Sequence, residues 1–298
     1  MAVLLIHLLS SFLLFSLGLY QVLSSTKSYL RSPRDYAARL YHPFPFSLSS
    51  FKHLPLYLLI FSLSFSLLHQ LLLSSAPDPL VKGSSSVYHF SSLQIAAVLF
   101  IFLFLSLAIL LSETTTLFPL PNDVFCLIAS VAFSLHYTVS ISSSSLTLGI
   151  EGKCDAISAR ISAASAVFSL ILAFNPRFFV ADLALGASIC LQGLWVLQTG
   201  LSLYAEAFIP EGCHQLLDVA TGVEGSTRCD LEESRFRAMA LLDLVFLFHV
   251  IFVLVVVVLA YAVLMKFVGV RRLGPYEALP TTTDSNHVQM KSLSGTQA

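Results

Sequence analysis

Residues 183–205 restrict the fold more than any other part of the chain. They include no charged side chain in 23 residues, and at about 1.5 Å per residue a helix of that length crosses the roughly 30 Å hydrocarbon core of a bilayer. Glycines recur every seventh residue, at Gly186, Gly193 and Gly200. They therefore share one stripe of the helix, where a neighbouring backbone can approach closely. The stretch predicts a membrane-spanning helix that packs tightly against another.

Polar side chains in this stretch need partners, because a bilayer core holds no water to bond them. Gln192, Trp195 and Thr199 form a second stripe, with Gln198 beside Trp195. The two carboxamides either join helices or face a ligand, and both interpretations stay open. Trp195 is the only tryptophan and lies away from the headgroup level, so we expect it to fill the bundle core.

Composition extends this interpretation to the whole chain. Of the 298 residues, 56% are hydrophobic and 11% charged, whereas about a quarter of the residues of a soluble domain are charged. The mean hydropathy is +0.82. The chain is therefore expected to be an integral membrane protein. With a net charge of −1 and its basic residues spread thinly, it has no electrostatic footprint for nucleic acid, and we exclude that partner.

Seven apolar segments predict an all-α bundle of seven transmembrane helices, at about residues 1–26, 54–74, 89–112, 124–143, 156–176, 183–205 and 238–267. The serine run 142–145 and the acidic residues 151–155 are expected to form a loop and a turn. The fifth segment spans only if Arg160 snorkels to the interface or pairs inside the bundle. We expect residues 1–272 to form the membrane domain and the polar tail, residues 273–298, to be disordered.

The distribution of basic residues predicts how the chain is oriented in the membrane. The loop 27–52 holds five basic residues and one acid, so the positive-inside rule predicts that it is cytosolic, with the N-terminus outside and the C-terminus inside. A cleaved signal peptide is the alternative for the first segment, although no basic residue precedes it. We expect a location in the endomembrane system or the plasma membrane.

Three cysteines then lie on the non-cytosolic side, where a disulfide can persist. The sequence predicts a bond between Cys213 and Cys229, with Cys154 as the competing partner.

Alternating spans bring ionisable and polar side chains to one level of the membrane. Five histidines fall in the outward half, and ionisable groups inside a membrane are costly enough to be functional candidates. Three roles stay open: structural hydrogen bonding, a ligand or proton pocket, and a zinc site. The pocket would use His69, His136, Gln192, Trp195, Gln198 and His249, and the zinc site would use His89, His136 and His249.

Two aspartates lie at the same outward level. Asp155 is at the outer end of the fifth segment, and Asp243 is expected to face Arg160 or Arg237 rather than to support His249. Asp155 or Asp243 could complete a zinc site.

Residues 192–200 resemble the Gln-Gly-x-Trp-x-x-Gln-x-Gly signature of the transmembrane protein 45 family, a domain of unknown function of animals and plants, sometimes labelled viral-response proteins in plants. The order of apolar segments agrees over about residues 1–270. The resemblance implies a multi-pass fold of about seven helices and no settled reaction. His89, His136 and His249 look like histidines that recur in that family. After Glu151 this chain lacks the His that family members often carry.

Three classes of function remain. The first is binding of a ligand or proton by a carrier or receptor, without a cofactor. The second is a membrane-embedded zinc hydrolase, similar only in layout to seven-helix ceramidase-type enzymes, whose local motifs are absent here. The third is a scaffold without a pocket. Whether the chain is an enzyme stays open, and the sequence favours a non-enzyme. The expected partners are the lipid bilayer and either another membrane protein or a second copy of the chain.

Overall fold

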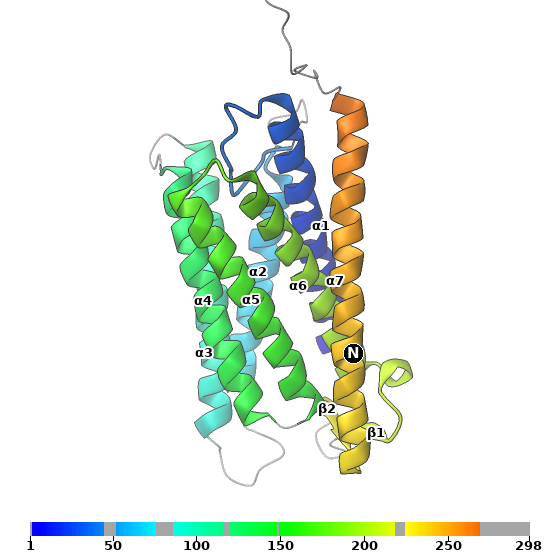
Figure 1. Cartoon of the computed structure of the whole chain (residues 1–298). Helices are drawn as coiled ribbons and strands as arrows, with labels where there is room; N and C mark the ends of the chain where they lie inside the picture. Colours follow the sequence, from blue (N-terminus) through cyan, green and yellow to red (C-terminus); the bar gives the residue numbers. More distant parts are fainter. Residues whose placement is uncertain are drawn as a thin grey trace, which may run out of the picture.

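Seven long helices and one β-hairpin dominate the computed structural model, which describes residues 2–44, 52–75, 86–115, 120–147, 149–217 and 224–268 (Figure 1). The helices are α1 (Ala2–Arg31), α2 (Leu54–Ser75), α3 (Ser86–Thr114), α4 (Asn122–Leu146), α5 (Ile150–Phe174), α6 (Phe179–Tyr204) and α7 (Glu232–Val268). All seven are long and apolar enough to cross a membrane. The predicted seven-helix bundle is confirmed, and its orientation stays a prediction. The predicted disordered tail lies outside the described residues.

The loop predicted for residues 142–145 and the turn predicted for residues 151–155 are wrong, because α4 continues to Leu146 and α5 begins at Ile150. Serine hydroxyls are satisfied inside α4: Ser144 Oγ donates to the Ile141 carbonyl at 2.8 Å, and Ser145 Oγ to that of Ser142 at 2.7 Å. Glu151 lies in the first turn of α5, where the helix dipole favours an acid. The fifth segment is thus a full-length helix.

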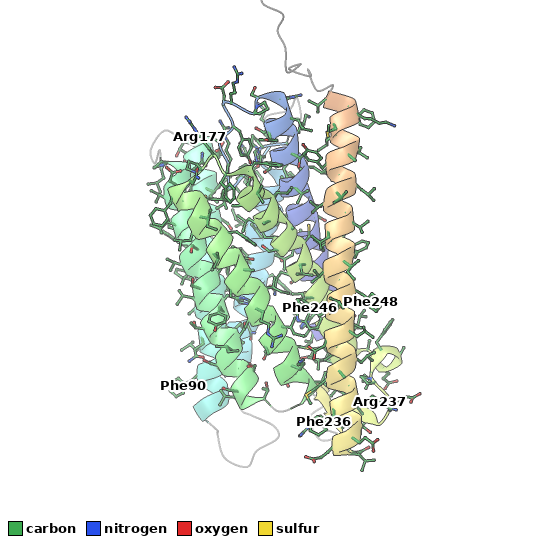
Figure 2. The ribbon with its side chains drawn as sticks, viewed as in Figure 1. Phe90, Arg177, Phe236, Arg237, Phe246 and Phe248 are labelled. Carbon is green, nitrogen blue, oxygen red and sulfur yellow. A yellow bond between two sulfur atoms is a disulfide. The ribbon has the colours of Figure 1, made fainter. Side chains whose placement is uncertain are left out.

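The first six helices form a ring, and α7 lies outside it. Neighbours pack in the order α1–α2–α3–α4–α5–α6, and α1 closes the ring against α6. Helix α7 packs on α1, α6 and α5, and Figure 1 shows it along one side of the bundle. We call the end where α1, α3, α5 and α7 begin the hairpin end, and the other the opposite end. In Figure 2, Arg237 marks the hairpin end and Arg177 the opposite end.

Large apolar side chains cover the outside of the bundle. Phe61, Phe174 and Phe267 are 73%, 81% and 84% exposed. On α7, Phe248 is on the outer side, whereas Phe246 packs against the core (Figure 2). Apolar surface of this extent is rare on soluble monomers. It is the surface that a helix bundle presents to lipid.

The glycine stripe of α6 packs against α1. A Cβ atom on Gly193 would lie 2.6 Å from the backbone N of Phe15, and one on Gly200 would lie 2.7 Å from Cβ of His7. Gly18 of α1 approaches equally closely, since its Cβ would lie 2.5 Å from the backbone N of Cys190. The predicted close approach is confirmed, and the partner is the first helix.

The hairpin consists of β1 (Cys213–Leu217) and β2 (Glu224–Cys229), which pair antiparallel. Cys213 lies directly opposite Cys229, and the two form a disulfide, the pair that the sequence predicted. Cys154 is buried with a free thiol, so it is not the partner. The Thr227 hydroxyl donates to the Leu203 carbonyl at 2.9 Å, which ties the hairpin to the end of α6.

Candidate functional site

A cavity of about 540 Å³ lies within the ring of helices α1 to α6. Most of its lining is apolar and consists of leucine, isoleucine, valine and phenylalanine side chains from α1, α2, α3, α4 and α6. Serines lie among them, including Ser62 and Ser66 of α2 and Ser106 of α3, and other polar side chains line the cavity from its middle to each end. Helix α7 adds no lining residue among those that the structure describes. The cavity is therefore long and mostly apolar, with hydrogen-bonding groups at intervals along it.

Between the middle of the bundle and the hairpin end, three hydrogen bonds join helices around the cavity. His136 Nδ1 of α4 lies 2.6 Å from Ser162 Oγ of α5. Gln192 Nε2 of α6 donates to Ser158 Oγ at 2.8 Å. The third joins α4 to α5, since the Ser143 hydroxyl donates to Asp155 Oδ2 at 2.6 Å. These six residues, which we call the polar cluster, all line the cavity.

The hydrogen bonds of the polar cluster fix which nitrogen of His136 donates and leave one acceptor of Gln192 unpartnered in the described part of the chain. Ser162 Oγ also lies 2.9 Å from the Ser158 carbonyl, which can only accept. Both Ser162 contacts are hydrogen bonds only if the Ser162 proton goes to that carbonyl and His136 carries its own proton on Nδ1. In the neutral ring Nε2 is then an acceptor. Gln192 Oε1 is buried and has no partner among the described residues.

Trp195 fills the wall between this cluster and α7, as the sequence predicted for the bundle core. It is 1% exposed, and its Nε1 donates to the Cys154 carbonyl at 2.9 Å. Its ring meets Phe246 edge-to-face with centroids 5.6 Å apart, and lies 6.3 Å from the ring of His249. Because Trp195 lines the cavity, the chain's only tryptophan is in a position to report what occupies it.

The opposite end of the cavity is closed by the segment after α1, whose residues Leu40, Tyr41 and His42 line it. Asp182 of α6 holds this segment. Its Oδ2 accepts a hydrogen bond from the Tyr36 hydroxyl, and its Oδ1 accepts one from Gln21 Nε2 at 2.8 Å. Gln21 Nε2 also lies 2.9 Å from the Arg39 carbonyl. This polar group was missed in the sequence, because its donors lie far from Asp182 along the chain.

Burial and charge keep the Tyr36 hydroxyl protonated. Burial raises the pKa of the Tyr36 phenol well above its ordinary value of 10, and the adjacent Asp182 carboxylate raises it further. Tyr36 therefore donates to Asp182 across the physiological pH range. Burial lowers the pKa of the nearby His42.

Of the six predicted pocket residues, His136, Gln192 and Trp195 line the cavity, and the other three are not among its lining residues. Gln198 Nε2 donates to Ser202 Oγ of its own helix at 2.9 Å. His249 Nδ1 lies 2.8 Å from the Val245 carbonyl, and its ring contacts Trp195 from outside the cavity. His69 is half-buried on α2.

The predicted zinc site remains untested as a set, because the side chain of His89 lies outside the described residues. Among the side chains that the structure does describe, no three histidine, cysteine or acidic residues gather as metal ligands. His136 and His249 lie on either side of the Trp195 wall.

The partner predicted for Asp243 is wrong. Its Oδ2 lies 2.7 Å from Lys153 Nζ, because α5 begins early enough to place Lys153 beside α7. Arg237 instead donates to the Glu211 carbonyl at 3.0 Å, and Arg160 is exposed on the outer face of α5.

Comparison with known proteins gives one family. A family described as "Family of unknown function (DUF716)" matches residues 122–262. The match covers just under half of the chain, from α4 into α7, and includes the whole polar cluster and the Trp195 wall. No curated protein matches the chain.

Proposed function

We propose that this protein binds one elongated, mainly apolar small molecule in its cavity, as a carrier or receptor within a cell membrane. The cavity itself carries the proposal. Its volume of about 540 Å³ falls in the range of roughly 300–1,000 Å³ typical of small-molecule sites, which are mostly apolar with a few oriented polar groups.

The lining favours a mainly apolar occupant. Leucine, isoleucine, valine and phenylalanine make up most of it, with serines in between, which is the composition typical of small-molecule sites. An apolar chain would replace the missing contacts along this lining. The polar cluster would then bind whatever polar group that chain carries.

A scaffold accounts for part of the same geometry. Gln192 and Trp195 each bond to α5, as side chains that only join helices would. A protein that only joins helices has no need of a cavity between them. The presence of the cavity therefore favours ligand binding over a scaffold.

The family resemblance fits this proposal without naming a ligand. The motif at residues 192–200 lies inside the matched region 122–262, and we propose that the chain belongs with the transmembrane protein 45 proteins on that basis. The bilayer would supply both the environment and the source of an apolar ligand, in the endomembrane system or the plasma membrane.

Trp195 fluorescence tests the proposal. The full-length protein in lipid nanodiscs is titrated with 1-bromododecane, whose bromine quenches tryptophan at short range. We expect the quenching to saturate as the probe concentration rises. We also expect compounds with an unbrominated dodecyl chain to reverse it. Ser62→Phe fills the cavity from α2, so its quenching should need at least fivefold more probe.

The matched control lies two residues away on the same helix. Ser64 is exposed, with its hydroxyl bonded to the Ile60 carbonyl at 2.8 Å, and it does not line the cavity. Ser64→Phe should behave like the unaltered chain. Equal quenching in all three proteins would mean that the probe acts from the lipid and that the cavity binds nothing.

A further inference from the structure

Asp155 is the one acidic side chain among the residues that line the cavity. Among the residues that the structure describes, its one hydrogen-bond donor is the neutral Ser143 hydroxyl, on Oδ2. No basic side chain in the described part of the chain pairs with it. Lys153, two residues away, pairs with Asp243 outside the cavity, and Arg160 faces outward. A carboxylate beside an apolar cavity is costly without a cation or further donors.

The rest of the polar cluster has one further acceptor without a donor within the described ranges. Gln192 Oε1 is buried and unpartnered among the described residues. The Asp155 side chain shares one face of α5 with Ser158 and Ser162, because they are spaced i, i+3 and i+7. Ser158 holds Gln192 and Ser162 holds His136. The cluster is thus a polar stripe about 10 Å long, with the carboxylate nearest the hairpin end.

We propose that the molecule bound in the cavity is a long-chain amine, with its protonated amino group at Asp155 and its alkyl chain running between the six helices. This rests on the proposed function, since it names the class of ligand for the same cavity. An ammonium group supplies three donors and the missing positive charge. Donors further along the ligand would meet Gln192 and His136.

A long-chain alcohol or a fatty acid would fit the apolar lining equally well but not this end. An alcohol supplies one donor and no charge. A fatty acid adds a second carboxylate beside Asp155, and like charges at close range repel. The order of preference expected for one chain length is therefore amine, then alcohol, then acid.

The experiment is competition for the 1-bromododecane site on the full-length protein in nanodiscs of a zwitterionic lipid, read by Trp195 fluorescence. Dodecylamine should displace the probe at a concentration at least tenfold below dodecan-1-ol, and dodecanoate should be weakest. Asp155→Asn should reduce the preference for the amine over the alcohol to less than threefold, with displacement by the alcohol unchanged. Asp155→Glu should restore most of the preference.

A control separates the cavity from general attraction of amines to an acidic surface. Glu233 lies at the same end, exposed in the first turn of α7 and outside the cavity. Glu233→Gln should leave the preference as it is.

Equal displacement by amine and alcohol, or an amine preference that survives Asp155→Asn, would overturn the inference while leaving the cavity as a binding site. If 1-bromododecane gave no saturable quenching that any of the compounds reversed, the proposed function itself would be overturned. Should Asp155→Asn fail to fold, equal displacement by amine and alcohol on the unaltered chain would still overturn the inference.

Discussion

Asp182 and Asp155 are two carboxylates towards opposite ends of the bundle, and their surroundings differ. Asp182 is 1% exposed and accepts a hydrogen bond on each oxygen, from Gln21 and Tyr36. Asp155 is half-buried and lines the cavity, and among the described residues it accepts a hydrogen bond on Oδ2 alone. Asp182 is satisfied by the chain itself, whereas Asp155 has bonding capacity left for something else. The comparison assigns a structural role to the first and a binding role to the second.

The strongest test of this comparison removes each carboxylate in turn. Asp182→Ala leaves the Tyr36 hydroxyl buried without its acceptor and removes one acceptor of the Gln21 amide, which keeps its bond to the Arg39 carbonyl. An orphaned buried group costs roughly 1–3 kcal/mol, and the lost bond of Gln21 adds to that. We expect a loss of about 3 kcal/mol in the free energy of unfolding, measured by thermal or denaturant unfolding in detergent.

Asp155→Ala removes one hydrogen bond and an unpaired charge, so we expect a change of less than about 1 kcal/mol in the same measurement. If Asp155→Ala destabilised the fold as much as Asp182→Ala, the two sites would not differ in the way described.

A second test acts through the α1–α6 contact, which brings Gln21 to Asp182. Gly193→Val places carbon atoms where the backbone of Phe15 lies, and overpacking of this kind costs roughly 1–3 kcal/mol. We expect the free energy of unfolding to fall by about 2 kcal/mol. The Ser143–Asp155 bond between α4 and α5 should remain intact.

The control is Ala184→Val, on α6 two residues from Gly186 and therefore away from the glycine stripe. Unfolding of Gly193→Val at the same temperature as Ala184→Val would show that the close approach of α1 and α6 contributes nothing.

The smallest expected effect is a pH dependence at the opposite end. Burial lowers the pKa of His42, while Asp182 acts to raise it and Arg39 to lower it further. The folded protein therefore favours neutral His42. Its contribution to stability is fully present above the ordinary histidine pKa of 6.5 and is lost as the pH falls through the lower folded value.

Thermal unfolding scanned from pH 7.5 to pH 4.5 should show a falling midpoint, and His42→Gln should flatten part of that fall. An identical pH profile for the two proteins would contradict the burial of neutral His42 at the cavity end.

The sequence predicts the helices because runs of apolar residues long enough to cross a bilayer have few other folds available. It mispredicted residues 142–145 because serine is common in turns, yet Ser144 and Ser145 bond to carbonyls of their own helix. The glycine stripe predicted a close partner but not which one. That choice depends on Gly18 of α1, 168 positions before Gly186, which faces the same contact.

Part of the candidate site was predictable from the sequence, because some of its residues interrupt apolar runs. His136, Gln192 and Trp195 stand out as polar or bulky side chains inside apolar runs, and all three line the cavity. His249 stands out equally but faces the outer side of the Trp195 wall. The Asp182 group was missed because Tyr36 lies in a connecting segment 146 residues from its partner. Periodicity within one helix says nothing about such a pair.

Native mass spectrometry of the intact protein, released from the membrane in mild detergent, tests the central claim most directly. We expect one small amphiphile bound per chain in the unaltered protein and in Ser64→Phe, and its loss in Ser62→Phe, which fills the cavity. The same bound mass in all three proteins, or no bound mass in the unaltered chain after extraction with its membrane lipids, would contradict a ligand-binding cavity.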